Sequence, residues 1–253
     1  MPRDAPENYV RTLVTSIEIV EIIQQQDGAS TAEIAEETDR AISTVHKHLH
    51  TLHDHGFLIK EGREYRIGLK FLDYGGFAKH KHPLTSVSKE VLKDLAQDTE
   101  ELVWLIVEEH GMGVYLSYAA GKKAVQTVGR QGVRAHLHQL AAGKCILAHL
   151  PDNRVREIIE QHGMPSSTDS TISNSSELLE ELENVREQGY AYNIEEEIEG
   201  ISAVSAPVIH NGDVLGGVSI AGPAARFENQ EYAESLRDHV IETANTIELR
   251  LKY

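Results

Sequence analysis

The segment from Ser30 to Arg66 restricts the fold of this chain more than any other stretch. It opens with a serine that is followed three residues later by Glu33, the capping-box signature of a helix start, and this predicts a short helix to about Thr38. Beyond a polar turn, apolar residues return at intervals of three and four over residues 42–55 and predict a second helix. Two short helices joined by a tight turn are typical of a helix–turn–helix unit.

Segments on both sides extend this unit. A preceding helix is predicted over residues 12–26. Its apolar positions at helical spacing are Leu13, Ile17, Val20 and Ile23 or Gln24. Two runs rich in β-forming residues, 57–59 and 65–67, flank Gly62 and predict a two-stranded wing with Arg63 near its tip. Three helices followed by a wing indicate a winged helix–turn–helix, with a small helical bundle that has one polar face as the alternative.

The polar face of the second helix in this unit suits contact with DNA. It carries no acid between residues 43 and 51. The candidates for entering the major groove are Ser43, Thr44, His46, Lys47 and His50. Arg40 and Arg63 are candidate phosphate contacts. His46 and His50 lie one turn apart and could chelate a metal ion, but a metal site usually needs a further ligand nearby. A DNA-facing role is therefore favoured, and no metal or cofactor is expected.

The charge of the chain is unusual for a partner of DNA. The formal net charge is −16. Residues 1–82 carry 10 Lys+Arg and 13 Asp+Glu, while residues 83–253 carry 14 and 27, so the acid is concentrated in the second part. An acidic surface suits a very salty cytoplasm and predicts a halophilic source; an ordinary acidic protein kept soluble by its charge is the alternative. Base-edge hydrogen bonds, apolar contacts and dimer geometry should then supply most of the DNA affinity.

The remaining chain divides into a linker helix and a larger domain. The winged domain is expected over residues 1–68, the linker helix over 69–84 with Pro83 at the boundary, and the larger domain over 85–253. Predicted strands in that domain are 102–107, 114–118, 124–128, 190–193, 202–209 and 214–220. Predicted helices are 86–99, 139–149, 153–161, 176–188 and 229–252. Strands separated by both hairpins and helices indicate an α+β fold with a mostly antiparallel sheet.

Little in the sequence could carry out catalysis. Cys145 is the only cysteine, so no disulfide can form within the chain. Cys145 and His149 lie one turn apart, but no third group is evident to orient them as a nucleophile and its base. Gly143-Lys144 lacks the earlier glycine of a phosphate-binding loop. We expect that the protein is not an enzyme.

The sequence has no signal peptide and no apolar run long enough to cross a membrane, which predicts a cytoplasmic protein.

Small residues in the larger domain make room for a ligand. A helix starting at Ala141-Ala142-Gly143 would present free backbone N–H groups, which bind anions. Arg130 and Arg134 precede it in a glycine-containing loop and could supply a cation. The predicted strand around Ser219 presents small residues on one face. Tight packing of a helix against a sheet also demands small residues, so a pocket and simple packing both remain open.

Several motifs follow one another in a recognisable order. In the first part they are Ser43-Thr44-Val45, Leu49 to Leu52, Gly56 and Tyr65-Arg66-Ile67-Gly68. In the second part they are Gln139 to Ala148, Gly189-Tyr190-Ala191 with Glu195-Glu196, Gly200 to Val208, and Ser219 to Pro223 with Arg226. Each motif is weak alone, but in this order and spacing the chain resembles the IclR-type transcriptional regulators over essentially its whole length.

The resemblance implies a GAF-like C-terminal domain that binds a small, usually acidic metabolite. It also implies dimers formed through the DNA-binding domains and often tetramers formed through the effector domains. The implied effector-binding positions are Ala141, Ala142, Gly143, Asn193, Ala203, Ser219 and Ala221. Ala203 and Ala221 stand where the family often has cysteine and serine, and Asn193 replaces an acid, so a less polar pocket is expected. Histidines replace the family's arginine- or leucine-rich run in the recognition helix.

The sequence thus predicts a DNA-binding transcription regulator that is controlled by a small-molecule effector and reads a near-palindromic operator as a homodimer or homotetramer. Two other classes remain open. One is a GAF-like sensor or enzyme whose N-terminal module binds a protein partner. The other is a DNA-binding protein that responds to no effector.

Overall fold

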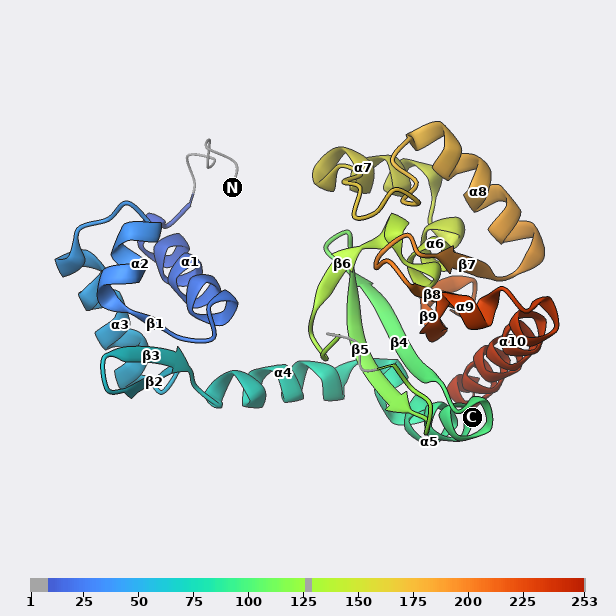
Figure 1. Cartoon of the computed structure of the whole chain (residues 1–253), viewed down its shortest axis with the longest axis horizontal. Helices are drawn as coiled ribbons and strands as arrows, with labels where there is room; N and C mark the ends of the chain where they lie inside the picture. Colours follow the sequence, from blue (N-terminus) through green and yellow to red (C-terminus); the bar gives the residue numbers. More distant parts are fainter. Residues whose placement is uncertain (1–8, 126–128, 253) are drawn as a thin grey trace. The chain divides into compact units, whose positions relative to one another are not determined.

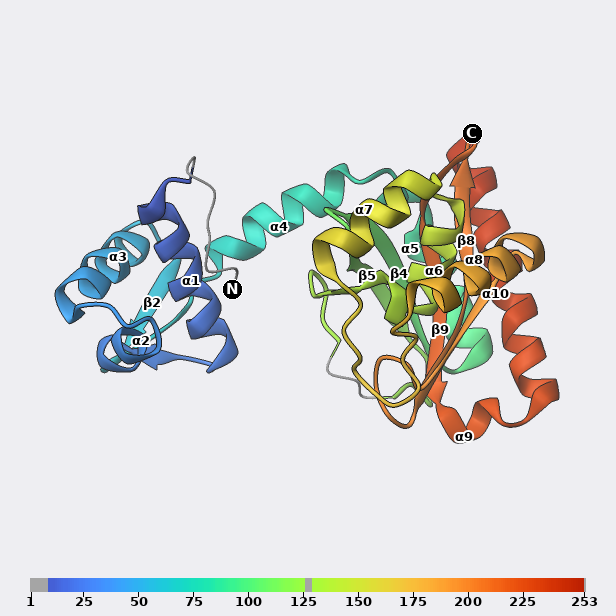
Figure 2. The same cartoon turned by 90° about the horizontal axis from the view of Figure 1, so that it is seen from above.

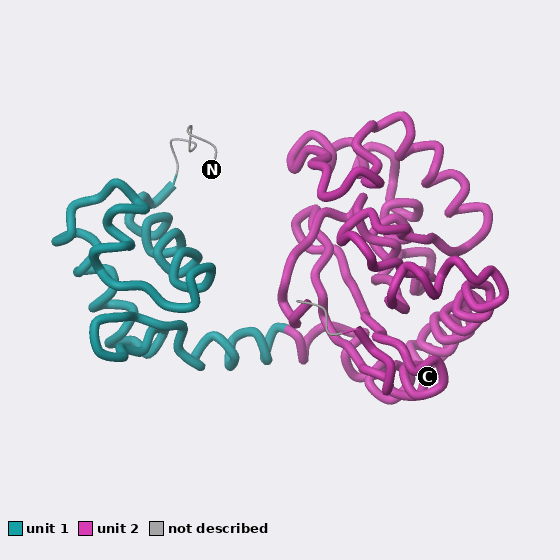
Figure 3. The backbone as a smooth tube through the Cα atoms, in the orientation of Figure 1, with its two compact units in different colours: residues 1–78 teal, residues 79–253 magenta. Residues whose placement is uncertain are grey.

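The computed structural model describes residues 9–125 and 129–252 of the chain. The chain forms two compact units, Met1–Ala78 and Lys79–Tyr253, each with its own hydrophobic core (Figures 1 and 3). The helix α4 (Lys70–Lys81) crosses the boundary between them.

The first unit contains three helices and a small sheet. Its elements are α1 (Arg11–Gln25), β1 (Ala29–Ser30), α2 (Thr31–Glu37), α3 (Ile42–Asp54), β2 (Leu58–Glu61) and β3 (Glu64–Ile67). The strands pair antiparallel in the order β1-β3-β2, so β2 and β3 form the expected wing and β1 adds a short third strand. This is a winged helix–turn–helix, as the sequence predicted.

The predicted capping box is present at the start of α2. The Glu33 amide donates to Ser30 Oγ at 3.4 Å, and the Ser30 amide donates to Glu33 Oε2 at 2.8 Å. Ser30 also pairs with Glu64 across β1 and β3. One serine therefore caps the first helix of the motif and attaches the wing to it.

The apolar positions predicted for α1 are only partly buried: Ile23 is in the core, but Leu13 and Ile17 are not. Leu13 and Ile17 are 60% and 52% exposed, whereas Ile19 and Ile23 are buried in the core. The buried face also includes Thr15, whose hydroxyl donates to the Arg11 carbonyl at 3.0 Å. Because that hydroxyl is satisfied within the helix, a polar residue takes a core position and the apolar pattern misleads. The opposite side of α1 leaves Leu13 and Ile17 in solvent.

The recognition helix packs through fewer residues than expected. Val45 and Leu49 are fully buried against the core, while Ile42, the first residue of α3, is 61% exposed. The core is completed by Ile34 from α2 and Leu58 from β2. Val45 and Leu49 hold α3 against the core, and the opposite face of the helix is exposed to solvent.

The second unit is an antiparallel sheet covered by helices on both faces (Figure 2). Its strands are β4 (Leu102–Glu109), β5 (Met112–Ala120), β6 (Arg134–His136), β7 (Ala191–Ile194), β8 (Ile201–His210) and β9 (Asp213–Pro223), in the order β6-β5-β4-β9-β8-β7. Its helices are α5 (Pro83–Thr99), η1 (Leu137–Gln139), α6 (Ala141–His149), α7 (Asp152–His162), α8 (Ser175–Gln188), α9 (Ala224–Phe227) and α10 (Gln230–Lys252). The α+β prediction with an antiparallel sheet is confirmed.

Two predicted elements of this unit differ in the structure. The predicted linker helix over 69–84 ends at Lys81, and α5 begins already at Pro83, where proline fits the first turn and His82 accepts the Leu84 amide at 3.3 Å. The strand predicted over 124–128 is absent at residues 124 and 125, and the rest of it lies outside the described residues. Instead β6, which was not predicted from the sequence, pairs with β5.

The two faces of the sheet have separate cores. On one face α5 and α10 pack over residues such as Val103, Val204 and Ile220. On the other face α6, α7 and α8 pack over Trp104 and Ile106. The first turn of α6 therefore lies over the centre of the sheet, where β9 and β8 run beneath it.

Candidate DNA interface and ligand pocket

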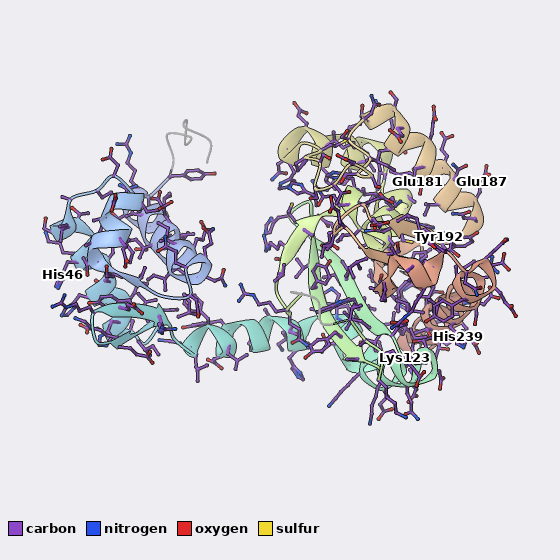
Figure 4. The ribbon with its side chains drawn as sticks, viewed as in Figure 1. His46, Lys123, Glu181, Glu187, Tyr192 and His239 are labelled. Carbon is purple, nitrogen blue, oxygen red and sulfur yellow. The ribbon has the colours of Figure 1, made fainter. Side chains whose placement is uncertain are left out.

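The face of α3 opposite the core is formed by the residues predicted to enter the major groove. All of them are exposed: Ser43, Thr44, His46, Lys47 and His50. His46 is labelled on this helix in Figure 4, and its ring centroid lies 6.3 Å from that of His50. His50 Nδ1 lies 2.9 Å from Asp54 Oδ2, one turn further along the helix. A carboxylate therefore orients the His50 ring and leaves its Nε2 edge outward.

A further histidine of α3 has a structural position. His48 Nδ1 lies 2.8 Å from Ser16 Oγ of α1. Burial and the nearby Arg40 guanidinium lower the pKa of His48 below its ordinary value. His48 is thereby favoured in its neutral form and joins α3 to α1, so the run of histidines is not a single functional face.

The cations predicted to contact phosphates occupy different settings. Arg40 donates to Glu18 of α1 at 3.0 Å, so its guanidinium is engaged within the unit. Arg63 is exposed in the turn between β2 and β3, next to Gly62, whose φ of +63° suits glycine. Arg66, on β3, lies 3.0 Å from Glu61 and 3.3 Å from Glu64. Arg63 is thus better placed than Arg66 to meet DNA.

A cavity of about 350 Å³ lies between the first turn of α6 and the sheet. It is lined by Trp104, Ile106, Tyr115, Gly129, Arg130, Val133, Leu140, Ala141, Ala142, Asn193, Glu197, Ile198, Ile201, Ser202, Ala203, Ser219 and Ala221. The size fits a small metabolite, and the lining is mostly apolar with a few polar groups, as in ligand sites generally.

Strand register brings most of the predicted effector positions together. Asn193, Ala203 and Ala221 are direct partners across β7, β8 and β9, and Ser219 is the partner of Trp104 on β4. All four line the cavity, as do Ala141 and Ala142.

Gly143, the other predicted effector position, does not line the cavity. A Cβ atom on Gly143 would overlap the carbonyl oxygen of Leu137 in η1. Glycine is therefore needed at this position for the close packing of α6 against η1, which is the packing explanation that the sequence left open.

The first turn of α6 presents backbone donors at the cavity. The first helical hydrogen bond runs from the Lys144 amide to the Leu140 carbonyl at 2.8 Å, and no side chain caps the helix. The amides of Ala141 and Ala142, which line the cavity, therefore have no acceptor within the helix. Ser219, only 4% exposed, adds a hydroxyl from the sheet below. These groups suit a carboxylate or another small anion.

Asn193 shapes the cavity through its amide group. Its Nδ2 donates to the Gln139 carbonyl at 2.6 Å, and its Oδ1 accepts from the Glu196 amide at 2.9 Å. The side chain joins β7 to the turn before α6. Asn193 therefore positions the first turn of α6, because both polar atoms of its side chain are hydrogen-bonded to the backbone.

The aromatic wall of the cavity was not predicted from the sequence. Trp104 and Tyr115 meet edge to face with ring centroids 4.8 Å apart. The alternation of Trp104 and Ile106 along β4 is the signal that places both on one face, but only the pairing with β5 brings in Tyr115. Arg134, which the sequence offered as a cation for this region, instead forms an ion pair with Glu109.

Glu197, also missed, introduces a carboxyl group to this lining. Tyr115 Oη donates to Glu197 Oε1 at 2.7 Å. Burial raises the pKa of Glu197 above its ordinary value, and the Tyr115 hydrogen bond opposes that rise. Burial likewise raises the pKa of the Tyr115 phenol.

A buried ion pair lies behind the cavity. Lys144, 2% exposed, donates from Nζ to Glu196 Oε1 at 2.8 Å and to Glu181 Oε1 at 3.1 Å. Glu181 lies on α8 and is labelled in Figure 4. Burial raises the pKa of Glu196, although Lys144 opposes the rise. The lysine of the predicted Gly-Lys motif therefore binds carboxylates of the protein.

Cys145 and His149 do not form a catalytic pair. The thiol is fully buried, donates to the Ser205 carbonyl at 3.2 Å, and has its pKa raised by burial. His149 Nδ1 lies 2.9 Å from the Cys145 carbonyl oxygen. The thiol is thus held as a neutral core group.

Among the described residues, no helix is long and apolar enough to cross a membrane.

A winged helix–turn–helix with a polar exposed helix, followed by an α+β unit with a small cavity, defines a DNA-binding regulator. The family model described as the bacterial transcriptional regulator IclR C-terminal matches residues 77–249, and a model named HVO_A0114 matches residues 15–72. The chain belongs to the IclR family of transcriptional regulators, and these are regulators rather than enzymes.

Relatives support this assignment over the whole chain. The probable HTH-type transcriptional regulator ArcR of Halobacterium salinarum is 32% identical over 248 residues, covering 96% of this chain and 94% of that protein. The IclR protein of Thermotoga maritima, known from a crystal structure, is also 32% identical in sequence. The two structures superpose with a TM-score of 0.78, covering 97% of this chain and 100% of the Thermotoga chain. An IclR homologue from Microbacterium hydrocarbonoxydans, solved with 4-hydroxybenzoate, shares the fold at 21% identity, with a TM-score of 0.80 over 95% of this chain and 99% of its own.

Proposed function

We propose that this regulator reads its operator with α3 and that a small carboxylate in the α6 cavity changes its affinity for DNA. The observation that carries the second part is the pair of free α6 amides facing a cavity together with the buried Ser219 hydroxyl. Backbone donors at a helix start bind anions without a charged side chain. The effector site and the DNA interface would then be two separate sites of one molecule, as an allosteric coupling requires.

The DNA contacts follow from the exposed face of α3. Ser43 and Thr44, in its first turn, suit phosphates and base edges, and His46 and His50 suit base edges in the major groove. Lys47 lies between the two histidines and suits a phosphate or a guanine. Arg63 in the wing would contact phosphate. Arg40 can join it only by giving up its bond to Glu18.

The effector class follows from the cavity lining. A carboxylate would bind at the Ala141 and Ala142 amides and Ser219, and an apolar body would pack on Trp104. Ala203 and Ala221 also line the cavity and would add methyl groups rather than polar groups to the effector site. The 4-hydroxybenzoate bound to a structural neighbour supports a small acid with a compact apolar body.

Dimers are supported by apolar side chains that the first unit leaves in solvent. Leu13 and Ile17 of α1 are exposed, and so are Leu72 of α4, at 70%, and Leu69 just before it, at 84%. Exposed apolar surface of this kind marks association sites. We infer a homodimer formed through this surface, which would read a near-palindromic operator, and tetramers formed through the second unit.

The parts of the chain would then divide the work. Residues 1–68 would bind DNA, 69–84 would link, and 85–253 would bind the effector and form higher oligomers. A regulator that acts on the chromosome would work in the cytoplasm. The halobacterial origin of a relative agrees with the acidic composition and supports a halophilic source.

The proposal is tested by DNA binding with and without small acids. An operator would be selected from random duplexes, and its affinity measured by fluorescence anisotropy while a panel of small carboxylates is titrated. We expect at least one acid to change the affinity and to stabilise the protein thermally. Binding to DNA with no response to any acid in either assay would instead identify a regulator without this effector class.

A further inference from the structure

The cavity contains an unexpected group for an acid-binding site. Glu197, in the connection between β7 and β8, lines the same cavity as the α6 amides. A carboxylate effector would therefore share a small apolar space with a carboxyl group of the protein. Two like charges in such a space repel strongly, so the arrangement restricts which acids can bind.

The Glu197 side chain is held across the cavity. Its partner Tyr115 comes from β5, and the strands β4, β9 and β8 separate β5 from β7 in the sheet. The 2.7 Å hydrogen bond thus joins two distant walls over the cavity floor. Tyr115 is only 7% exposed and Glu197 is half-buried, so this hydrogen bond is shielded from water mainly on the Tyr115 side.

The acceptors of Glu197 are only partly used. Tyr115 donates one hydrogen bond to Oε1, and no other hydrogen bond or ion pair of this carboxyl group is present among the described residues. A carboxylate has two oxygens with about four acceptor positions. Arg130 also lines the cavity, but it forms no ion pair with Glu197 in the described structure. Among the described residues the carboxyl group therefore has no cation paired with it, and most of its acceptor positions are unused.

We propose that the effector is a carboxylate whose far end carries a hydrogen-bond donor, an ammonium or a hydroxyl group, and that Glu197 with Tyr115 selects for it. This inference rests on the proposed carboxylate site at α6. The effector would bind by its carboxylate to the helix amides and by its donor to Glu197. Acids that end in a methyl group would leave Glu197 without its second partner, and diacids would place two carboxylates together.

The test compares acids that differ only in their far group. One series is 4-(aminomethyl)benzoate, 4-hydroxybenzoate, 4-methylbenzoate and terephthalate. The other is 5-aminopentanoate, 5-hydroxypentanoate, hexanoate and hexanedioate. Dissociation constants are measured by calorimetry in KCl for the wild type, for Glu197→Gln, and for Glu199→Gln as a control on the same connection with an exposed side chain.

In the wild type we expect the ammonium or hydroxyl acid of at least one series to bind about 10-fold more tightly than its methyl counterpart, and the diacid to bind worst. Glu197→Gln should weaken the ammonium acid by about 10-fold, strengthen the diacid, and change the hydroxyl acid little, because an amide oxygen still accepts. Glu199→Gln should leave the order as in the wild type.

The possible failures are distinguishable. If the acids bind and Glu197→Gln leaves their order unchanged, the selection by Glu197 is wrong while the carboxylate site stands. If the methyl acids or diacids bind best in the wild type, the selection is again wrong. If no acid of either series binds the wild type, both the carboxylate site and the inference drawn from it are rejected.

Discussion

Lys144 and Glu196 form an ion pair in the interior of the second unit, with Nζ and Oε1 2.8 Å apart and the residues only 2% and 6% exposed. Lys144 lies on α6, whose first turn faces the cavity, and Glu196 immediately precedes Glu197 at its opposite side. The pair therefore sets the distance between the amides proposed to hold the effector carboxylate and the carboxyl group proposed to select its far end.

Replacing Lys144 with methionine should destabilise the second unit strongly. The substitution leaves Glu196 buried without its cation, and breaking one side of a buried ion pair typically costs about 3–5 kcal/mol. Urea unfolding would measure the loss, with Lys93→Met, at an exposed position of α5, as the control. The double variant Lys144→Met/Glu196→Leu should recover much of the stability, since no charge of the pair then remains. Equal stability of Lys144→Met and the control would contradict the energetic role of the pair.

Two glycines in helices should respond in opposite directions to alanine. A Cβ on Gly143 would overlap the Leu137 carbonyl, whereas a Cβ on Gly75 of α4 meets nothing within 4 Å. Gly143→Ala should therefore cost at least ~1–3 kcal/mol through overpacking. Gly75→Ala should gain about 0.5–1 kcal/mol, because alanine loses less backbone freedom. Unfolding midpoints of the two variants would check both signs, and a stable Gly143→Ala protein would show that η1 can move away.

The sequence was informative wherever a local signal matched the tertiary context. The capping box at Ser30 and the turn at Gly62 depend on neighbours in the chain, and both are present. The buried face of α1 could not be predicted, because Thr15 satisfies its own hydroxyl and packs in the core beside Ile19. β6 was missed because a strand of three residues carries too little periodicity to be recognised.

Only some of the residues that line the cavity could be predicted from the sequence. The small residues on β8 and β9 were found because family motifs mark them, and strand register then places Ala203 beside Ala221. Tyr115 and Glu197 lie 82 residues apart in the chain and meet only through the fold of the sheet. Neither belongs to a local motif, so the pair that we propose to select the ligand could be found only from the structure.

Substitutions on α3 should separate phosphate contacts from base contacts. Lys47→Ala should weaken binding to every DNA sequence, whereas His46→Ala and His50→Ala should alter base preference at about 1–3 kcal/mol per contacted base pair. His55→Ala, at the far end of the helix, serves as the control. Gel-shift titrations on the selected operator and on single-base variants would measure these effects. Unchanged binding in all three variants would contradict the assignment of this face to DNA.

The affinity for the operator should depend only weakly on salt. The exposed α3 face carries one lysine, Lys47, and the cations Arg40 and Arg66 are paired within the first unit. Each phosphate neutralised contributes about 0.9 to the slope of log affinity against log salt concentration. Few free cations therefore predict a shallow slope. A steep loss of affinity between moderate and molar KCl would contradict this expectation and would point to further phosphate contacts.

The burial of Glu197 should make stability depend on pH in a definite direction. The folded protein raises the pKa of this carboxyl group above its ordinary value of 4.5, so it binds a proton more tightly folded than unfolded. The contribution of Glu197 to the stability of the folded protein is therefore most favourable below about pH 4.5. That contribution is lost as the pH rises through the raised pKa of the folded state.

Glu197→Gln removes that loss and keeps an oxygen that can accept from Tyr115. The variant should be more stable than the wild type near neutral pH. The difference should shrink as the pH falls through the raised pKa of folded Glu197 towards 4.5, because the wild-type carboxyl group then takes up a proton. Urea unfolding at a series of pH values would measure it, with Glu199→Gln showing no such trend because its side chain is exposed. A constant difference across the series would mean that Glu197 titrates alike in the folded and unfolded chain. The carboxyl group would then be well solvated in the cavity and could not impose the selection of a donor-bearing acid.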